Sequence, residues 1–184
     1  MCLTDARNGY LHDAYLYSGK GSDERTLTPD EQKVSIPTQA VLRLTAQLQK
    51  SNRNVTTDKW LGSIELVKEL QDRGLTYVGT LKKNKREILK EFLSHKTRAV
   101  DSNIFGFANN VTMVSHVPRK NRAVVLVSSM HHSKTFDDVS GKPEIIAYYN
   151  MTKGSVDSLD EKCAQYSCGR RTRRWSMTIF FQNS

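Results

Sequence analysis

Four aspartates have the residue type and the placement that a divalent-metal site needs. Asp5 and Asp58 each follow a short run of strand-like residues. Asp157 and Asp160 stand three positions apart in a stretch with helical character, so they would share one helix face. Carboxylate oxygens are ligands that Mg²⁺ prefers, and carboxylates from several elements can hold ions for phosphodiester cleavage. The alternative is that Asp58 caps a turn and that the helical pair is merely solvated.

Two groups of Lys and Arg side chains are candidates for contacts with nucleic-acid phosphates. The members of the first group, which follows a predicted strand, are Lys82, Lys83, Lys85 and Arg86. The members of the second group, beside Trp175, are Arg170, Arg171, Arg173 and Arg174. Backbone contacts of this kind position a nucleic acid without reading its sequence. The alternative for each group is an ordinary solvated surface.

The overall composition supports a polyanionic partner. The chain has 184 residues and a formal net charge of +9, which favours nucleic acid over neutral partners. No apolar run approaches the roughly 20 residues of a spanning helix, so we expect no membrane partner. Three cysteines are too few for a disulfide framework and fit a reducing compartment.

The elements that must position the acids can be read from periodicity and from turn residues. The predicted strands cover residues 1–4, 10–17, 53–57, 75–81, 104–107, 111–117, 123–129 and 144–149. The predicted helices cover residues 35–49, 63–74, 82–95, 155–168 and 174–181. Ser63 is the expected cap of the second helix, and Gly74 is its expected stop. This order predicts an α/β fold in which a β-rich insertion precedes the last acidic helix.

Three segments resemble the piggyBac-type transposases. They are residues 53–60 (RNVTTDKW), 148–157 (YYNMTKGSVD) and 168–175 (CGRRTRRW), within a resemblance that covers nearly the whole chain. The chain departs from the family at Lys59, where Asn is usual, and at Ser155, where a second Gly is usual.

The resemblance implies an RNase H-like core, a mixed sheet with flanking helices, in three parts. Residues 1–81 would form its first part, residues 82–143 an insertion, and residues 144–184 its completion. Asp5, Asp58 and Asp157 match the family's metal-binding acids, and Asp160 matches a further acid one turn on.

The implied activity is metal-dependent DNA strand cleavage and transfer at TTAA sites in the nucleus, with Mg²⁺ or Mn²⁺ as cofactor. The implied partners are DNA and a second copy, which would bind through regions outside this chain. Family members extend beyond both ends of the matched core, so we expect this chain alone to have little or no transposition activity. The alternative is a domesticated, non-catalytic DNA-binding or protein-interaction domain.

Overall fold

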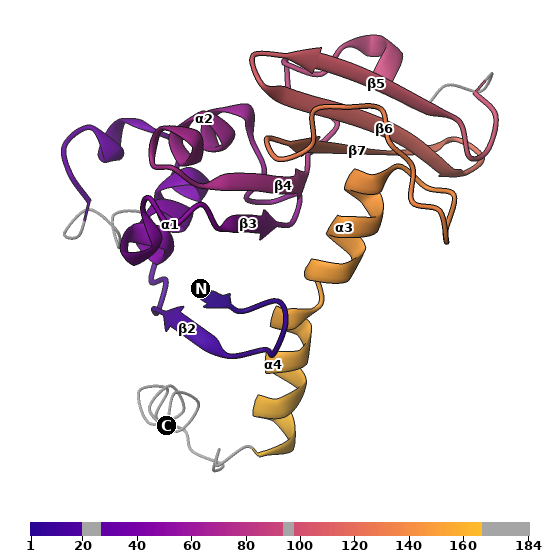
Figure 1. Cartoon of the computed structure of the whole chain (residues 1–184). Coiled ribbons are helices and arrows are strands. Elements are labelled where there is room, and N and C mark those ends of the chain that lie inside the picture. Colours follow the sequence, from indigo (N-terminus) through magenta and orange to yellow (C-terminus); the bar gives the residue numbers. More distant parts are fainter. Residues whose placement is uncertain (20–26, 94–97, 167–184) are drawn as a thin grey trace.

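The computed structural model describes residues 1–19, 27–93 and 98–166, which form two β-sheets and four α-helices (Figure 1). The smaller sheet is a hairpin of β1 (Cys2–Thr4) and β2 (Leu11–Ala14). The strands of the larger sheet are β3 (Asn54–Thr57), β4 (Thr76–Thr80), β5 (Asn103–Ala108), β6 (Val111–Arg119) and β7 (Arg122–Ser128). Their spatial order is β3-β4-β7-β6-β5, so β3 and β5 lie at the two edges.

The direction of each strand follows from its connection. β3 and β4 are parallel, because the helix α2 (Ile64–Asp72) carries the chain back between them. β5, β6 and β7 are joined by short turns and pair antiparallel, and β7 also pairs antiparallel with β4. The β-rich segment that follows β4 therefore extends the same sheet.

Three further α-helices complete the described fold. They are α1 (Ile36–Thr45), α3 (Glu144–Thr152) and α4 (Ser155–Gln165). Short 3₁₀ turns lie at η1 (Glu31–Lys33), η2 (Ala46–Leu48) and η3 (Lys90–Phe92). The predicted cap at Ser63 is present, since its hydroxyl accepts the N–H of Leu66. None of the helices that the structure describes is long and apolar enough to span a membrane.

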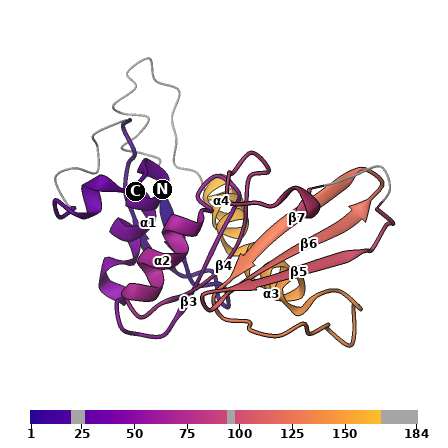
Figure 2. The ribbon, with the colours of Figure 1, turned by 90° about the horizontal axis from the view of Figure 1, so that it is seen from above.

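Two hydrophobic clusters cover the two faces of the larger sheet. Because side chains alternate along a strand, Tyr77 and Val78 of β4 point to opposite faces. Tyr77 packs in the cluster built by α1 and α2. Val78 packs with Ile145 and Ile146 of α3. Figure 2 shows α1 and α2 together at one side of the molecule and α3 beneath β5, β6 and β7.

The segment 144–149 is a helix, so the prediction of a strand there was wrong. Its Ile and Tyr residues favour strands in isolation, but propensity gives way to packing when one helical face fits a core. Pro143 precedes the first helical residue, and Ile145 and Ile146 are buried against the sheet. The predicted helix over residues 82–95 is also wrong: among residues 82–93 the structure has turns and the short η3, which send Ile88 and Phe92 separately into the core.

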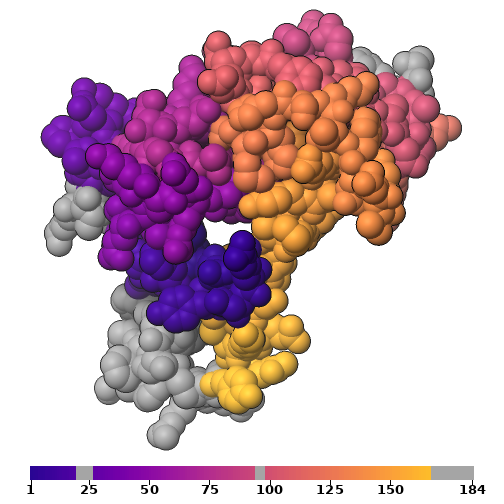
Figure 3. Space-filling view, in the orientation of Figure 1, coloured from indigo at the N-terminus to yellow at the C-terminus, as the bar shows by residue number. Residues whose placement is uncertain are grey.

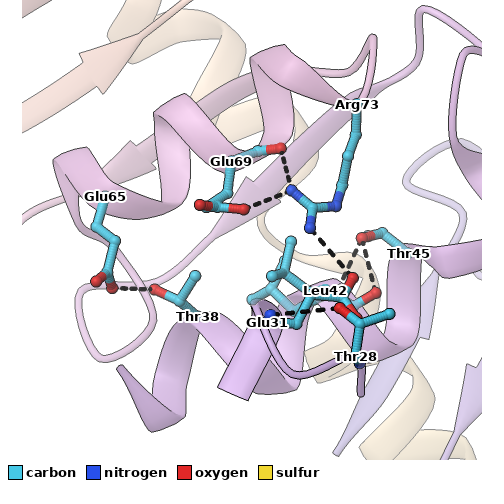
Figure 4. A network of polar contacts seen from close by, with 9 residues as sticks. Thr28, Glu31, Thr38, Leu42, Thr45, Glu65, Glu69 and Arg73 are labelled. Atoms are coloured by element: carbon cyan, nitrogen blue, oxygen red, sulfur yellow. Dashed lines mark hydrogen bonds and ion pairs between the residues drawn. The ribbon is translucent and has the colours of Figure 1, made fainter. Parts of the chain in front are cut away.

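A polar network joins α1, α2 and the segment before α1 (Figure 4). Arg73, which directly follows α2, pairs with Glu69 of α2 and with Glu31, whose carboxylate lies 3.1 Å away. Glu65 accepts bonds from the Ser35 hydroxyl at 2.6 Å and the Thr38 hydroxyl at 2.9 Å. Burial opposes ionisation of Glu65, but these hydrogen bonds outweigh it and hold the pKa of Glu65 below its ordinary value of 4.5. The network thus ties the start of α1 to α2.

We expect the Glu65 network to make stability depend on pH in the acid range. A lowered folded pKa gives stability that is complete above the ordinary pKa and is lost as the pH falls through the folded pKa. Urea unfolding between about pH 6 and pH 3 should therefore show that the free energy of unfolding falls as the pH falls. The fall should be smaller in Glu65→Gln than in the wild type. The difference should be on the order of 1 kcal/mol, the scale of a partly exposed, charge-assisted bond. Equal pH slopes in the two proteins would contradict this assignment.

Candidate metal and nucleic-acid site

Asp58 is held in a turn at the carboxyl end of β3. Its Oδ1 atom accepts the N–H of Trp60 at 2.9 Å and that of Leu61 at 3.3 Å. Its backbone carbonyl accepts the N–H of Gly62 at 3.1 Å. The Asp58 side chain is nevertheless exposed, so the carboxylate is fixed in place and open to a ligand. Asp58 therefore caps this turn, and its exposed carboxylate can also bind a ligand.

Asp5 ends β1 in a similar way. Its Oδ1 atom accepts the N–H of Arg7 at 2.7 Å, and its backbone N–H donates to the carbonyl of Tyr10 at 2.8 Å. Gly9 closes the turn with a positive φ of 70°, the conformation that favours glycine. Asp5 is half-buried, and the turn predicted between the first two strands is confirmed.

Asp157 and Asp160 lie in the first half of α4, and both are exposed. α4 lies beside β1, and Figure 3 shows the indigo hairpin and the yellow helix in contact. Burial raises the pKa of the Cys2 thiol in β1, and the negative charge of Asp160 raises it further against the pull of the N-terminus. Asp160 therefore lies near Cys2 of β1, the strand that leads into Asp5.

Two pairs of hydroxyl groups connect the acid-bearing elements. The Oγ1 of Thr4 lies 2.7 Å from the Oγ of Ser155. The Oγ1 of Thr56 lies 2.9 Å from the Oγ1 of Thr152. Thr4 precedes Asp5 directly, so both pairs bring the junction between α3 and α4 against strands that end in an acid.

The four acids suit a divalent ion in their chemistry, but they do not form a closed cage. Within residues 1–19, 27–93 and 98–166, no three Asp, Glu, His or Cys side chains lie close enough together to hold one ion. Mg²⁺ is usually held by one or two carboxylates, with waters and substrate phosphates as its other ligands. The donor set at the strand ends fits that mode, and the assignment of all four acids to one site stays a prediction.

A basic hollow opens where β3 and β4 end, with Lys59, the residue after Asp58, in its lining. It has a volume of about 500 Å³, and its charged lining residues are Lys59, Lys82 and Lys83. Lys59 was missed in the sequence, although a signal was present. It follows β3 as Lys82 follows β4, and the carboxyl ends of parallel strands meet at one edge of the sheet.

The remaining predicted basic residues have different surroundings. Lys85 is half-buried, and its charge helps to lower the pKa of Glu65, after the hydrogen bonds to that group. Arg86 is exposed. The predicted cluster at Arg170, Arg171, Arg173 and Arg174 lies outside the described residues.

Comparisons with known proteins agree on one family. The family model described as transposase IS4 matches residues 1–183. The chain is also similar to the solved structure of a piggyBac transposase in a synaptic complex with hairpin DNA. The two are 35% identical, with a TM-score of 0.84. The match covers 98% of this chain and 36% of that one, so the chain spans about a third of the length of that relative.

The turn at Asp58 provides a way to separate its structural contribution from any chemistry. Asp58→Ala removes the acceptor for Trp60 and Leu61, so we expect it to lower the free energy of unfolding by about 1 kcal/mol. Asp58→Asn keeps an Oδ1 acceptor, so it should unfold at nearly the urea concentration of the wild type. Equal destabilisation by both substitutions would show that the charge, and not the cap, stabilises the turn.

Proposed function

We propose that this chain, which belongs to the transposase IS4 family, is the catalytic domain of a piggyBac-type transposase that cleaves and joins DNA strands. It has the RNase H-like fold, with a mixed five-stranded sheet and flanking helices. The observation that carries the proposal is the placement of the acids. Two follow strands, and two lie on α4, whose first residue bonds the strand that leads into Asp5.

Transposases of this family generally use divalent metal ions. We infer that Asp5, Asp58 and Asp157 would hold Mg²⁺ or Mn²⁺ here, with Asp160 assisting. Such ions activate the attacking oxygen and stabilise the leaving oxygen of a phosphodiester. The turns at Asp5 and Asp58 would hold the carboxylates at the strand ends before DNA binds. Fixing these side chains in advance lowers the entropic cost of assembling the site.

DNA is the partner that the charge distribution favours. Lys59, Lys82 and Lys83 line the hollow, and Lys59 directly follows Asp58, so a strand held at Asp58 would bring neighbouring phosphates near these ammonium groups. Arg86 and the cluster at residues 170–174 would extend this contact. We infer that the target is TTAA, that a second copy pairs through regions outside this chain, and that the protein acts in the nucleus.

One observation favours a second candidate function, a domesticated DNA-binding or protein-interaction domain that does not cut. The described carboxylates do not close a three-ligand cage. A domain that keeps the basic hollow but does not cleave DNA would still bind DNA. The two candidates differ in cleavage, and they share DNA binding.

We expect metal-dependent nicking of a supercoiled plasmid that carries TTAA sites. Nicking should require Mg²⁺ or Mn²⁺ and should fall by about 100-fold or more in Asp58→Asn, since even a misplaced catalytic group can cost that factor. Gel separation of nicked and supercoiled plasmid gives the rate. A plasmid without TTAA is the control for target choice. DNA binding without nicking in either ion would favour the non-catalytic candidate.

We also expect DNA affinity to depend steeply on salt through the hollow. Each phosphate that the protein neutralises contributes about −0.9 to the slope of log K against log salt concentration. The triple substitution of Lys59, Lys82 and Lys83 by Gln should make that slope shallower by about 0.9 for each phosphate that is no longer neutralised. Fluorescence anisotropy with a labelled duplex at several salt concentrations gives the binding constants from which this slope is obtained.

The matched control removes the same charge away from the hollow. Lys50, Lys68 and Lys142 are exposed, and their substitution by Gln should leave the slope nearly unchanged. Equal slopes for the two triple variants would mean that net charge, and not the hollow, governs binding.

A further inference from the structure

A chain of side-chain hydrogen bonds runs from β4 across β3 to the end of α3. The Thr76 hydroxyl donates to Oδ1 of Asn54 at 3.2 Å, and Nδ2 of Asn54 donates to Oγ1 of Thr56 at 3.1 Å. The Thr56 oxygen lies 2.9 Å from that of Thr152. The Thr152 hydroxyl lies 3.0 Å from the carbonyl oxygen of Tyr148, one helical turn earlier. The chain thus connects three elements of the fold.

Each hydroxyl has one proton, which restricts the direction of this chain. When the Thr152 hydroxyl donates to the carbonyl of Tyr148, its oxygen accepts from Thr56. Thr56 then donates to Thr152 and accepts from Asn54. Hydrogen bonds aligned in this way polarise and strengthen one another. The contact between Thr56 and Thr152 is therefore more strongly oriented than an isolated pair of hydroxyl groups.

The chain ends where the acids begin. Thr56 stands two positions before Asp58, and Asp58 directly follows the last residue of β3. Thr152 is the last residue of α3, and α4 with Asp157 begins three positions later. The bond between Thr56 and Thr152 therefore joins the neighbourhoods of two acids that are distant in the sequence.

α4 needs such a contact because packing holds it only weakly. None of its residues is buried by the described part of the chain. α3, by contrast, buries Ile145 and Ile146 against the sheet. The position of α4 is set at its start by the end of α3 and by the bond between Thr4 and Ser155, and further along by its contacts with β1.

We propose that Thr56 and Thr152 are positioning residues that set the separation between Asp58 and the acids of α4. The proposal rests on the proposed function, since the separation matters for catalysis only if these acids act together. Groups that orient metal ligands without touching the metal typically change activity or metal affinity by about 10- to 100-fold when removed. They change the overall stability of the fold much less.

Thr56→Val tests the proposal, because it replaces the hydroxyl with a methyl group of similar shape. In the full 184-residue chain, hydrogen exchange of the amides of residues 159–165 should become faster. Those amides are informative because the first turn of a helix lacks internal hydrogen bonds in any case. The kcat of plasmid nicking should fall by about 10-fold or more, with KM for DNA and the urea midpoint unchanged.

Two further variants separate positioning from simple stabilisation. Thr56→Ser restores the hydroxyl and should restore both readouts. Thr76→Val removes a hydroxyl from the far end of the same chain, so it should leave exchange in α4 and kcat within about 2-fold of the wild type. Unchanged exchange in Thr56→Val, or equal effects of Thr56→Val and Thr76→Val, would overturn the proposal. If the wild type does not nick DNA, the proposed function fails, and the exchange data alone still decide whether Thr56 positions α4.

Discussion

The alternation of side chains along β3 is the constraint on which the rest of the structure depends. Val55 and Thr57 point into the core, where Thr57 bonds the hydroxyl of the buried Tyr77 at 2.7 Å. Thr56 leaves the opposite face, where it lies 2.9 Å from the hydroxyl oxygen of Thr152. One short strand thus serves packing with one set of residues and the contact with α3 with the other. A slip of one residue would turn Val55 out and Thr56 in, so the core also fixes the register of the strand that Asp58 follows.

The second consequence concerns how precisely each acid is held. The core anchors α3 through Ile145 and Ile146, and the Thr56 contact fixes its last residue. Beyond Gly154 no residue of α4 is buried by the described part of the chain, and the helix lies beside β1. Asp157 lies in the first turn of α4, close in sequence to the anchored end of α3.

Local sequence patterns predicted the parts of the fold that depend on local interactions. The strand before Asp58, the helix capped by Ser63 and the hairpins of β5, β6 and β7 follow from periodicity and turn residues. The segment 144–149 was misread because its Ile and Tyr residues favour a strand, and only the sheet beneath it selects a helix. Lys59 and the bond between Thr56 and Thr152 were missed because both depend on contacts between distant segments. In the second case the partners are 96 residues apart.

The open arrangement of the carboxylates has a mechanistic consequence under the proposed function. β1 pairs with β2, while β3 lies at the edge of the larger sheet, so Asp5 and Asp58 follow strands of separate sheets. Carboxylates that do not close a cage leave coordination positions for phosphate oxygens. Binding of DNA would then complete the site. Interactions that form only in the reacting complex raise the rate, because they do not stabilise the enzyme before it reacts. The basic hollow at the ends of β3 and β4 would offer ammonium groups to the flanking phosphates of such a strand. In this arrangement the substrate is itself a structural part of the catalytic centre.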